Sequence, residues 1–562
     1  MFTTVHLDNI LVRSIDLKKP DGLIDRLPRG MYFQKKQYDG AQLKSFAEVK
    51  DRLPKPILSG NQEYLDCYWY AVQLAFKNSH QPTKESGFVS NFVDAAFNEN
   101  IFMWDTAFIT MYCNLFHNYL PGICSLDNFY CKQLPNGEIA RELVRATGKE
   151  FPKWANVDGK PLYSYFHNHY GYRRLNTVHQ IPYAEMYKPD LGREVPTPPY
   201  LTLDALNHPI MVWAEYVSFL HTGDLDRLEL VVEPLFQYFK ALWTHIRHAN
   251  HLYVTDWASM DNSPRNKYLG CAVDTSCEMV LFAEMLLKIM DELQRAGRIE
   301  QQVYTKRRAF LKTTARLTKD AINNLMWDED LGFYFDLKDN QERAPVKTIA
   351  AYWALISGVA DEAKAQRLVE WLNDPHTFNR LHRVPVCAAD EEGYDPEGGY
   401  WRGAVWAPTN TMVISGLLKY GYEELAREIA LNHLDNVVKI FTKTGTIWEN
   451  YPPDFVSAGQ NDKGDFVGWS GLGPILYLIA FKIGLKANAL KEMVEWSIAD
   501  ETEQLGCENY WFFGKTASFY ATKADGAWQI KISTGDQFKL RIKYCGRSYD
   551  YQITGDTTLV VS

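Results

Sequence analysis

The stretch YVTDWASMDNSPR, residues 253–265, lies between two long segments of helical periodicity. It contains two carboxylates, an amide, an arginine and a tryptophan, and its Asn-Ser-Pro sequence favours a turn. Binding and catalytic residues gather on loops that a rigid scaffold holds in place. We therefore expect this loop to carry functional side chains and the helices on either side to position it.

Composition is typical of a globular protein that binds a neutral or small polar ligand. The length of 562 residues is enough for a large core and for more than one domain. Hydrophobic residues make up 46% and charged residues 23% of the chain, which is typical of globular proteins. The net charge of −9 argues against a nucleic-acid partner, because such proteins need a basic surface to neutralise phosphates. The nine cysteines lack metal-ligand spacing, so we expect free thiols, a reducing compartment, and neither a metal nor a cofactor.

The chain shows no signal for membrane insertion or export. Its first residues lack a basic segment followed by an apolar one, and no run of about 18 apolar residues occurs. We expect a cytoplasmic protein with no membrane partner, or a periplasmic one if a signal peptide has been removed.

Helix-like segments follow one another along most of the chain. Apolar residues recur at spacings of three and four, and Gly223, Asp224, Gly297 and Gly421 mark boundaries. The expected helices span residues 60–78, 104–118, 122–133, 204–221, 223–248, 272–297, 299–326, 347–358, 361–373, 409–420, 422–442 and 470–484.

The connections between these twelve helices alternate between short turns and long polar loops. Short turns at one end and long loops at the other predict a mainly α fold, an (α/α)6 barrel or toroid, with the long loops on one face. We expect an N-terminal extended or β bracing segment at 1–58, the barrel at 59–490 and a small β domain at 491–562.

The predicted β domain rests on alternating apolar and polar residues. Segments 527–532 and 538–544 flank one Gly-Asp pair, and 549–553 and 557–561 flank another. Such spacing predicts two hairpins.

Four polar clusters lie in long loops or at helix starts. They contain Trp104 and Asp105; Gln133 and Asn136; Asp256 and Asp261; and Glu449 with Trp469 after it. From the helix order, we expect the loops of Asp261 and Glu449 to lie on the same face and roughly opposite each other. Two carboxylates facing across an aromatic-lined opening suit glycoside hydrolysis, in which one protonates the leaving oxygen and the other acts on the opposite face of the sugar.

The motifs MDNSPR at 260–265, GYWRGAVWAPTN at 399–410, WENY at 448–451 and FVGWSGLG at 466–473 resemble glycoside hydrolase family 63. The likeness is greatest to bacterial members and the mannosylglycerate-hydrolase-like catalytic domain. Residues 104–105 and 134–137 also resemble the related trehalase family. The family usually has glycine where Ser259 stands, and larger members have an N-terminal β domain where this chain has about 58 residues.

The resemblance implies an (α/α)6 barrel that hydrolyses α-glycosides with inversion. It assigns Asp261 as the general acid and Glu449 as the general base, about 6.5–9.5 Å apart so that a water fits between. Asp256 then becomes a supporting hydrogen-bond partner. The implied sugar-binding residues are Trp104, Asp105, Gln133, Asn136, Arg402, Trp406 and Trp469.

The leading hypothesis is an inverting, exo-acting α-glycosidase for a short α-glycoside, an α-glucoside first and an α-mannoside second. Three alternatives remain open. An inverting phosphorylase would need a phosphate site in place of the base, and a sugar epimerase would use paired histidines, for which His167 and His169 are candidates. A non-catalytic sugar-binding protein would lack one of the carboxylates.

Overall fold

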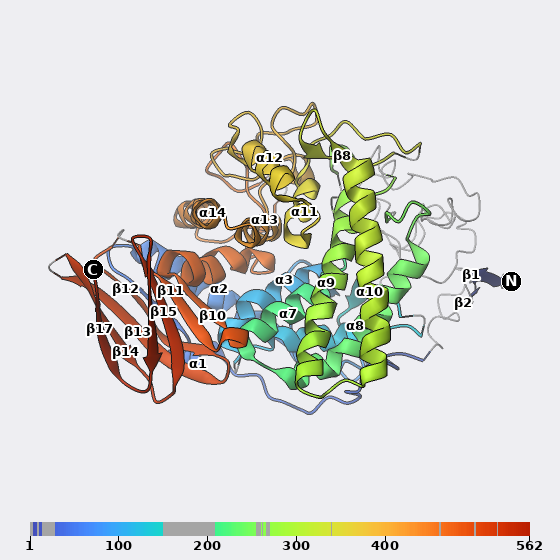
Figure 1. Cartoon of the computed structure of the whole chain (residues 1–562). Helices are drawn as coiled ribbons and strands as arrows, with labels where there is room; N and C mark the ends of the chain where they lie inside the picture. The colour runs from blue at the N-terminus through green and yellow to red at the C-terminus, as the bar shows by residue number, and fades with distance from the viewer. Residues whose placement is uncertain are drawn as a thin grey trace.

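The computed structural model shows a body of helices with a β region at the C-terminal end (Figure 1). The described residues are 4–7, 10–13, 28–117, 119–135, 137–149, 208–253, 260, 262–265, 270–338, 340–459, 462–499, 502–524 and 526–562.

One set of helices forms the centre of the body and is buried on nearly every side. All of α3 is buried, as are most residues of α7, α11, α13 and η12. A helix that is apolar all round lies in the interior of a large protein. The set comprises α3 (Met103–Cys113), α7 (Met211–Thr222), α9 (Val273–Arg295), α11 (Trp353–Ser357), α13 (Ala407–Lys419), η11 (Trp469–Leu472) and η12 (Gly473–Ile483).

These central helices contact one another in chain order, and the order returns to its start. Helix α3 packs against α7, α7 against α9, α9 against α11, and α11 against α13. Both α13 and α3 then pack against η11.

A second set of helices lies outside the first, and its long members are amphipathic. Helix α10 buries mainly the face that carries Leu311, Ala315 and Thr318. Figure 1 shows α8, α9 and α10 side by side, and α14 contacts both α13 and η12. The set comprises α2 (Gln62–Lys77), η4 (Gly122–Leu126), α4 (Asp127–Tyr130), α8 (Leu225–His245), α10 (Gln301–Ala321), η8 (Ile322–Met326), α12 (Glu362–Asn373) and α14 (Glu423–Thr444).

The boundary residues act as the sequence predicts. Gly223 adopts a left-handed φ of 71° at the end of α7, a conformation that favours glycine. Asp224 then caps α8, because its carboxylate accepts a hydrogen bond from the Arg227 backbone N–H at 2.9 Å. Each predicted helical segment coincides with observed helix in the part of the chain that is described.

The C-terminal strands form two sheets that lie to one side of the helices (Figure 1). The rings of Phe512 and Phe538 meet across the two sheets with centroids 4.9 Å apart. One sheet has the order β10-β11-β15-β16, with β10 (Leu485–Asn488), β11 (Met493–Ser497), β15 (Phe538–Tyr544) and β16 (Arg547–Ile553). The other has the order β17-β14-β13-β12-β3, with β17 (Thr557–Val561), β14 (Ala527–Ser533), β13 (Lys515–Ala524), β12 (Gln504–Phe512) and β3 (Lys55–Leu58).

The strands predicted at 527–561 are present, but the predicted hairpins are wrong. Strand β14 pairs with β13 and β17, and β15 pairs with β11 and β16, so both Gly-Asp segments connect different sheets. Among the described residues, two tight turns lie instead at Phe513-Gly514 and Cys545-Gly546, where all four residues have positive φ. Two successive residues of positive φ match the twist of a two-residue hairpin.

The N-terminal part of the chain adds an edge strand to the second sheet. Strand β3 pairs antiparallel with β12, so that Leu58 lies opposite Leu505.

Within the described ranges, no helix is both long and apolar enough to cross a membrane. The nine cysteines are all free thiols.

Candidate active site

Five aromatic side chains form one cluster where the central helices begin. The Trp401 and Trp406 rings stack with centroids 4.4 Å apart, and Trp469 lies 5.5 Å from both Trp406 and Trp104. Tyr400 meets the edge of Trp406 at 4.8 Å. The structure thus brings together the three predicted tryptophans and adds Tyr400 and Trp401, which we call the aromatic cluster.

Helix starts position the predicted tryptophans. Trp104 lies in the first turn of α3, Trp406 immediately precedes α13, and Trp469 is the first residue of η11. A side chain in the first turn of a helix is held in place by the regular backbone of that helix. The loop that precedes the helix supplies its neighbours. Tyr400 and Trp401 belong to the short helix η10 (Tyr400–Arg402), inside the motif at 399–410. Their position in that motif was the signal that could have identified them.

Glu449 is buried and bonded to this cluster through both its side chain and its backbone. Only 2% of the residue is exposed. The Tyr400 hydroxyl donates to Glu449 Oε1 at 3.0 Å, and Trp469 Nε1 donates to the Glu449 carbonyl at 2.8 Å. These two bonds hold Glu449 in one orientation against the aromatic cluster.

Asp261 and Asp256 lie outside the described residues, as do Ser259, His167 and His169. The two neighbours of position 261 are described. Met260 is buried, and the Asn262 side chain donates to the Gly399 carbonyl at 3.0 Å and accepts from the Trp401 backbone N–H at 2.9 Å. Asn262 therefore connects the MDNSPR motif directly to the segment that carries Tyr400.

Arg265 fixes the end of the same motif. Its guanidinium donates to both carboxylate oxygens of Asp336 at 2.7 Å and to Asp274 Oδ1 at 3.0 Å. Asp274 stands in the first turn of α9, and the Val273 N–H donates to Asp336 at 2.9 Å. Charge-assisted, two-pronged bonds of this kind fix the position of the arginine side chain.

A cavity of about 10 Å³ lies beside the aromatic cluster, with room for about one water molecule. His208 forms part of its wall and was missed in the sequence. Its Nδ1 lies 2.5 Å from Glu278 Oε1; burial lowers the pKa of His208, but the charge of Glu278 and this contact raise it overall. The cavity is lined by Trp104, His208, Met260, Asp274, Ile349, Ala350, Trp353, Trp401, Pro408 and Thr409.

Asp105 follows Trp104 in the first turn of α3 and is 8% exposed. Burial raises the pKa of its carboxyl to about 8, although its own backbone N–H and the charge of Arg141 act in the opposite direction. The carboxyl therefore carries a proton near neutral pH and can donate as well as accept a hydrogen bond.

The other predicted binding residues are placed differently. Both hydrogen bonds described for the Gln133 side chain go from its amide nitrogen to backbone carbonyls, those of Gly137 and Pro234, at 2.7 and 2.9 Å. The Arg402 side chain is 47% exposed and pairs with Asp395 at 3.1 Å. Asn136 lies outside the described residues. None of the contacts described for Gln133 or Arg402 joins the aromatic cluster.

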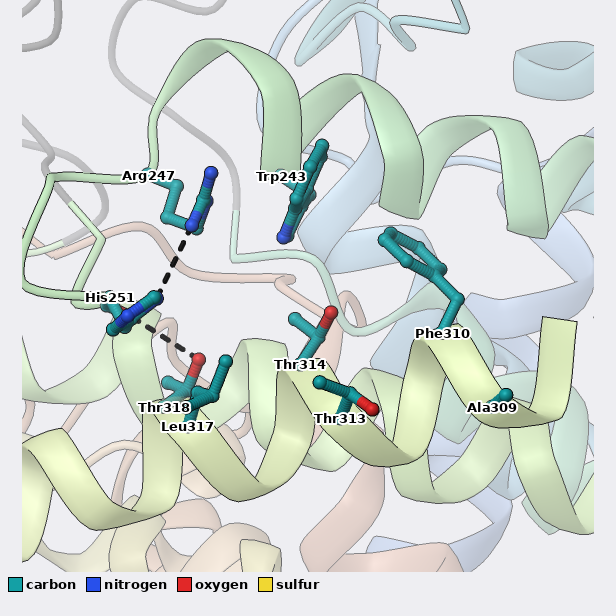
Figure 2. A pocket seen from close by; sticks show the side chains of 9 residues that line it. All are labelled: Trp243, Arg247, His251, Ala309, Phe310, Thr313, Thr314, Leu317 and Thr318. Carbon is teal, nitrogen blue, oxygen red and sulfur yellow. Dashed lines mark hydrogen bonds between the residues drawn. The ribbon is translucent and has the colours of Figure 1, made fainter.

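A larger groove of about 360 Å³ lies elsewhere, between the end of α8 and helix α10 (Figure 2). The Arg247 guanidinium lies 4.3 Å from the centre of the Trp243 ring and contacts His251 Nδ1 at 3.3 Å. Phe310 meets the edge of Trp243 at 5.2 Å. None of the predicted site residues that the structure describes lines this groove.

A protein-family model described as the mannosylglycerate hydrolase MGH1-like glycoside hydrolase domain matches residues 202–470. Residues 202–470 are therefore similar to the glycoside hydrolase domain of this family. The match covers the MDNSPR motif, Glu449 and most of the aromatic cluster. The predicted enzyme class, glycoside hydrolase, is thereby confirmed.

Two curated relatives belong to the groups that the motifs suggest. A mannosylglycerate hydrolase of Rubrobacter radiotolerans is 28% identical over 197 residues, which are 34% of this chain and 41% of the relative. A cytosolic neutral trehalase of Kluyveromyces lactis is 30% identical over 167 residues, 27% of this chain and 22% of the relative. The chain thus spans less than half the length of each of these two proteins.

A solved structure shows the same fold at low sequence identity. The GH63 mannosylglycerate hydrolase from Thermus thermophilus, in complex with glucose, superposes with a TM-score of 0.53 at 17% identity. The alignment covers 73% of this chain and 99% of that one. The helical body is therefore of the type found in that hydrolase.

Proposed function

We propose that the chain is an inverting, exo-acting α-glycosidase in which Asp261 is the general acid and Glu449 the general base. The observation that carries the proposal is the burial of Glu449 against the aromatic cluster, with Tyr400 bonded to its carboxylate. Asn262, the residue after Asp261, is bonded to the segment that holds Tyr400. These contacts support a site that combines both carboxylates.

In this mechanism Glu449 Oε1 or Oε2 removes a proton from water as the water oxygen attacks the anomeric carbon. The bond from that carbon to the leaving oxygen breaks on the opposite face, and Asp261 transfers its proton to this oxygen. The new bond forms opposite the old one, so the configuration inverts. The Tyr400 hydroxyl keeps the Glu449 carboxylate directed at the water.

The aromatic cluster and Asp105 form the proposed sugar-binding subsite. Trp104, Trp406 and Trp469 provide flat apolar walls for a sugar ring, and the protonated Asp105 carboxyl provides a donor for a hydroxyl. Gln133, Asn136 and Arg402 remain predictions of the sequence.

We further propose that the two helix sets are the inner and outer rings of an (α/α)6 barrel. The sequential contacts from α3 to η11 and back to α3 support a closed inner ring. We also propose that the domain boundaries lie at residues 58 and 490. Strand β3 belongs to the first segment and pairs with β12 of the C-terminal β domain.

For the substrate, a short α-glucoside is the first candidate and an α-mannoside the second. The relatives are named for trehalose and mannosylglycerate. These two compounds are therefore the first to be tested in a panel of disaccharides and glycosyl-glycerates. Release of a single sugar from one end, without dependence on phosphate, is the expected result. Cleavage that requires phosphate would favour a phosphorylase instead.

The role of the two carboxylates is tested by Asp261→Asn and Glu449→Gln on the best substrate of the panel. Each is expected to lower kcat by at least about 10³-fold, because the reaction loses a proton-transfer partner. The circular dichroism spectrum should stay unchanged. Most of the activity surviving in either variant would refute the assignment.

A further inference from the structure

Asp462 lies in the loop that faces Glu449 and accepts an unusual number of hydrogen bonds. Its carboxylate receives the backbone N–H groups of Lys463 at 2.8 Å, Asn450 at 3.1 Å and Gly459 at 3.3 Å, and the Asn450 side-chain amide at 3.3 Å. Burial raises the pKa of this carboxyl to about 7, although the backbone donors act in the opposite direction. Four hydrogen-bond donors surround this carboxylate. It therefore holds the loop together and is not a solvated surface group.

The peptide unit between Glu449 and Asn450 is held at both of its polar ends. Its carbonyl oxygen accepts from Trp469 Nε1 at 2.8 Å, and its N–H donates to Asp462 at 3.1 Å. The Glu449 backbone N–H, one peptide earlier, donates to the Lys463 carbonyl at 3.0 Å. Since a peptide unit is planar, fixing these groups fixes the direction in which the Glu449 side chain leaves the backbone.

The surrounding residues suit a carboxylate at position 462. The four groups described around it are all donors, so an amide in its place would direct its own N–H groups at one or more of them. Gly459 is needed as well, because a Cβ there would lie 2.4 Å from Asn450 Oδ1.

We propose that Asp462 is a positioning residue for Glu449: its carboxylate fixes the Glu449–Asn450 peptide and thereby aims the base at the attacking water. The inference rests on the proposed function of Glu449 as the base. Asp462 donates no proton and contacts no substrate in this scheme; it acts through Glu449 alone.

A base that is misaligned by about 1 Å loses roughly 10²-fold in rate. The substitution Asp462→Asn should therefore lower kcat by about 10- to 100-fold. The KM should change by less than about twofold, because the bonds described for Asp462 go to Asn450, Gly459 and Lys463 and not to the aromatic cluster that binds the sugar.

A double-mutant cycle separates positioning from simple structural support. Four proteins are compared: the wild type, Asp462→Asn, Glu449→Gln and the double variant. The substrate is the α-glycosyl fluoride of the sugar that the panel identifies, because fluoride leaves without a proton from the acid. Asp465→Asn is the matched control, since the bonds described for its carboxylate go to the side chains of Tyr70 and Thr446 and not to the Glu449 peptide.

The inference is supported if Asp462→Asn lowers kcat at least about 10-fold in the wild-type background, changes it less than about twofold in the Glu449→Gln background, and Asp465→Asn equals the wild type. Equal losses in both backgrounds would overturn it, because Asp462 would then act independently of Glu449. So would an unchanged kcat in the wild-type background. Full activity in Glu449→Gln alone would instead remove the base from the proposed function, and the positioning role with it.

Discussion

At the scale of single residues, the site depends on how the Glu449 carboxylate is held. The sequence proposes Glu449, Trp104 and Trp469 from polar clusters and Trp406 from the family resemblance, and the structure places all four close together. Tyr400 lies in one of the quoted motifs, but its bond to Glu449 spans 49 residues and could not be predicted. Contacts of this range depend on how distant loops meet, which no local pattern records.

The bond from Tyr400 is tested by Tyr400→Phe. The change removes the hydroxyl and keeps the ring that packs on Trp406, so kcat should fall about 10-fold while stability stays nearly unchanged. Steady-state kinetics measure the effect. Tyr394→Phe, which removes a hydroxyl bonded to Asp454 at 2.8 Å in the same part of the chain, should leave kcat unaltered.

Asp105 should make stability depend on pH. Burial raises the pKa of its carboxyl from 3.8 in the unfolded chain to about 8 in the folded one, so the folded state keeps a proton that the unfolded state loses. The stabilisation is complete below the unfolded pKa and is lost as pH rises through the folded pKa, by up to about 1.4 kcal/mol per pH unit in between.

The substitution Asp105→Asn removes this titration. The free energy of unfolding of the variant should fall less steeply than that of the wild type between about pH 4 and about pH 8. Denaturant unfolding at several pH values measures the difference. Parallel pH dependences in the two proteins would contradict a raised pKa at Asp105.

At the scale of helices and strands, short sequence patterns predicted the helices and their ends but not the pairing of the strands. Helix periodicity and the Gly223-Asp224 boundary predicted α7 and α8 well, because caps and apolar faces are encoded within a few residues. The two Gly-Asp segments were misleading, because strand pairing is decided by long-range packing of the sheets.

The cap of α8 is tested by Asp224→Ala. Losing the bond to the Arg227 N–H should lower the free energy of unfolding by about 1 kcal/mol. Differential scanning calorimetry measures the change as a lower Tm. Asp226→Ala in the same turn, an exposed residue paired with Arg298, should have a much smaller effect.

At the scale of the whole molecule, strand β3 joins the beginning of the chain to its end. Leu58 is 3% exposed and packs where β3 pairs with β12. The sequence predicted extended structure before residue 58 but gave no indication of its partner, which lies near the opposite end of the chain.

The substitution Leu58→Ala should lower the free energy of unfolding by about 3 kcal/mol, because it leaves a cavity at this junction. Backbone amides of β12 near Leu505 should exchange hydrogen faster, although the mutation lies in another part of the sequence. Hydrogen exchange followed by mass spectrometry measures this. Unchanged exchange in β12 would show that the two strands do not stabilise each other; Lys55→Ala, at an exposed position of β3, serves as the control.

The central claim is that water attacks the sugar opposite the leaving group, activated by Glu449. The most direct test is proton NMR of the first anomer that the enzyme releases from an α-glycoside, recorded before the product mutarotates. The mechanism predicts that the β anomer appears first and that the α anomer grows only later. Initial release of the α anomer would contradict it.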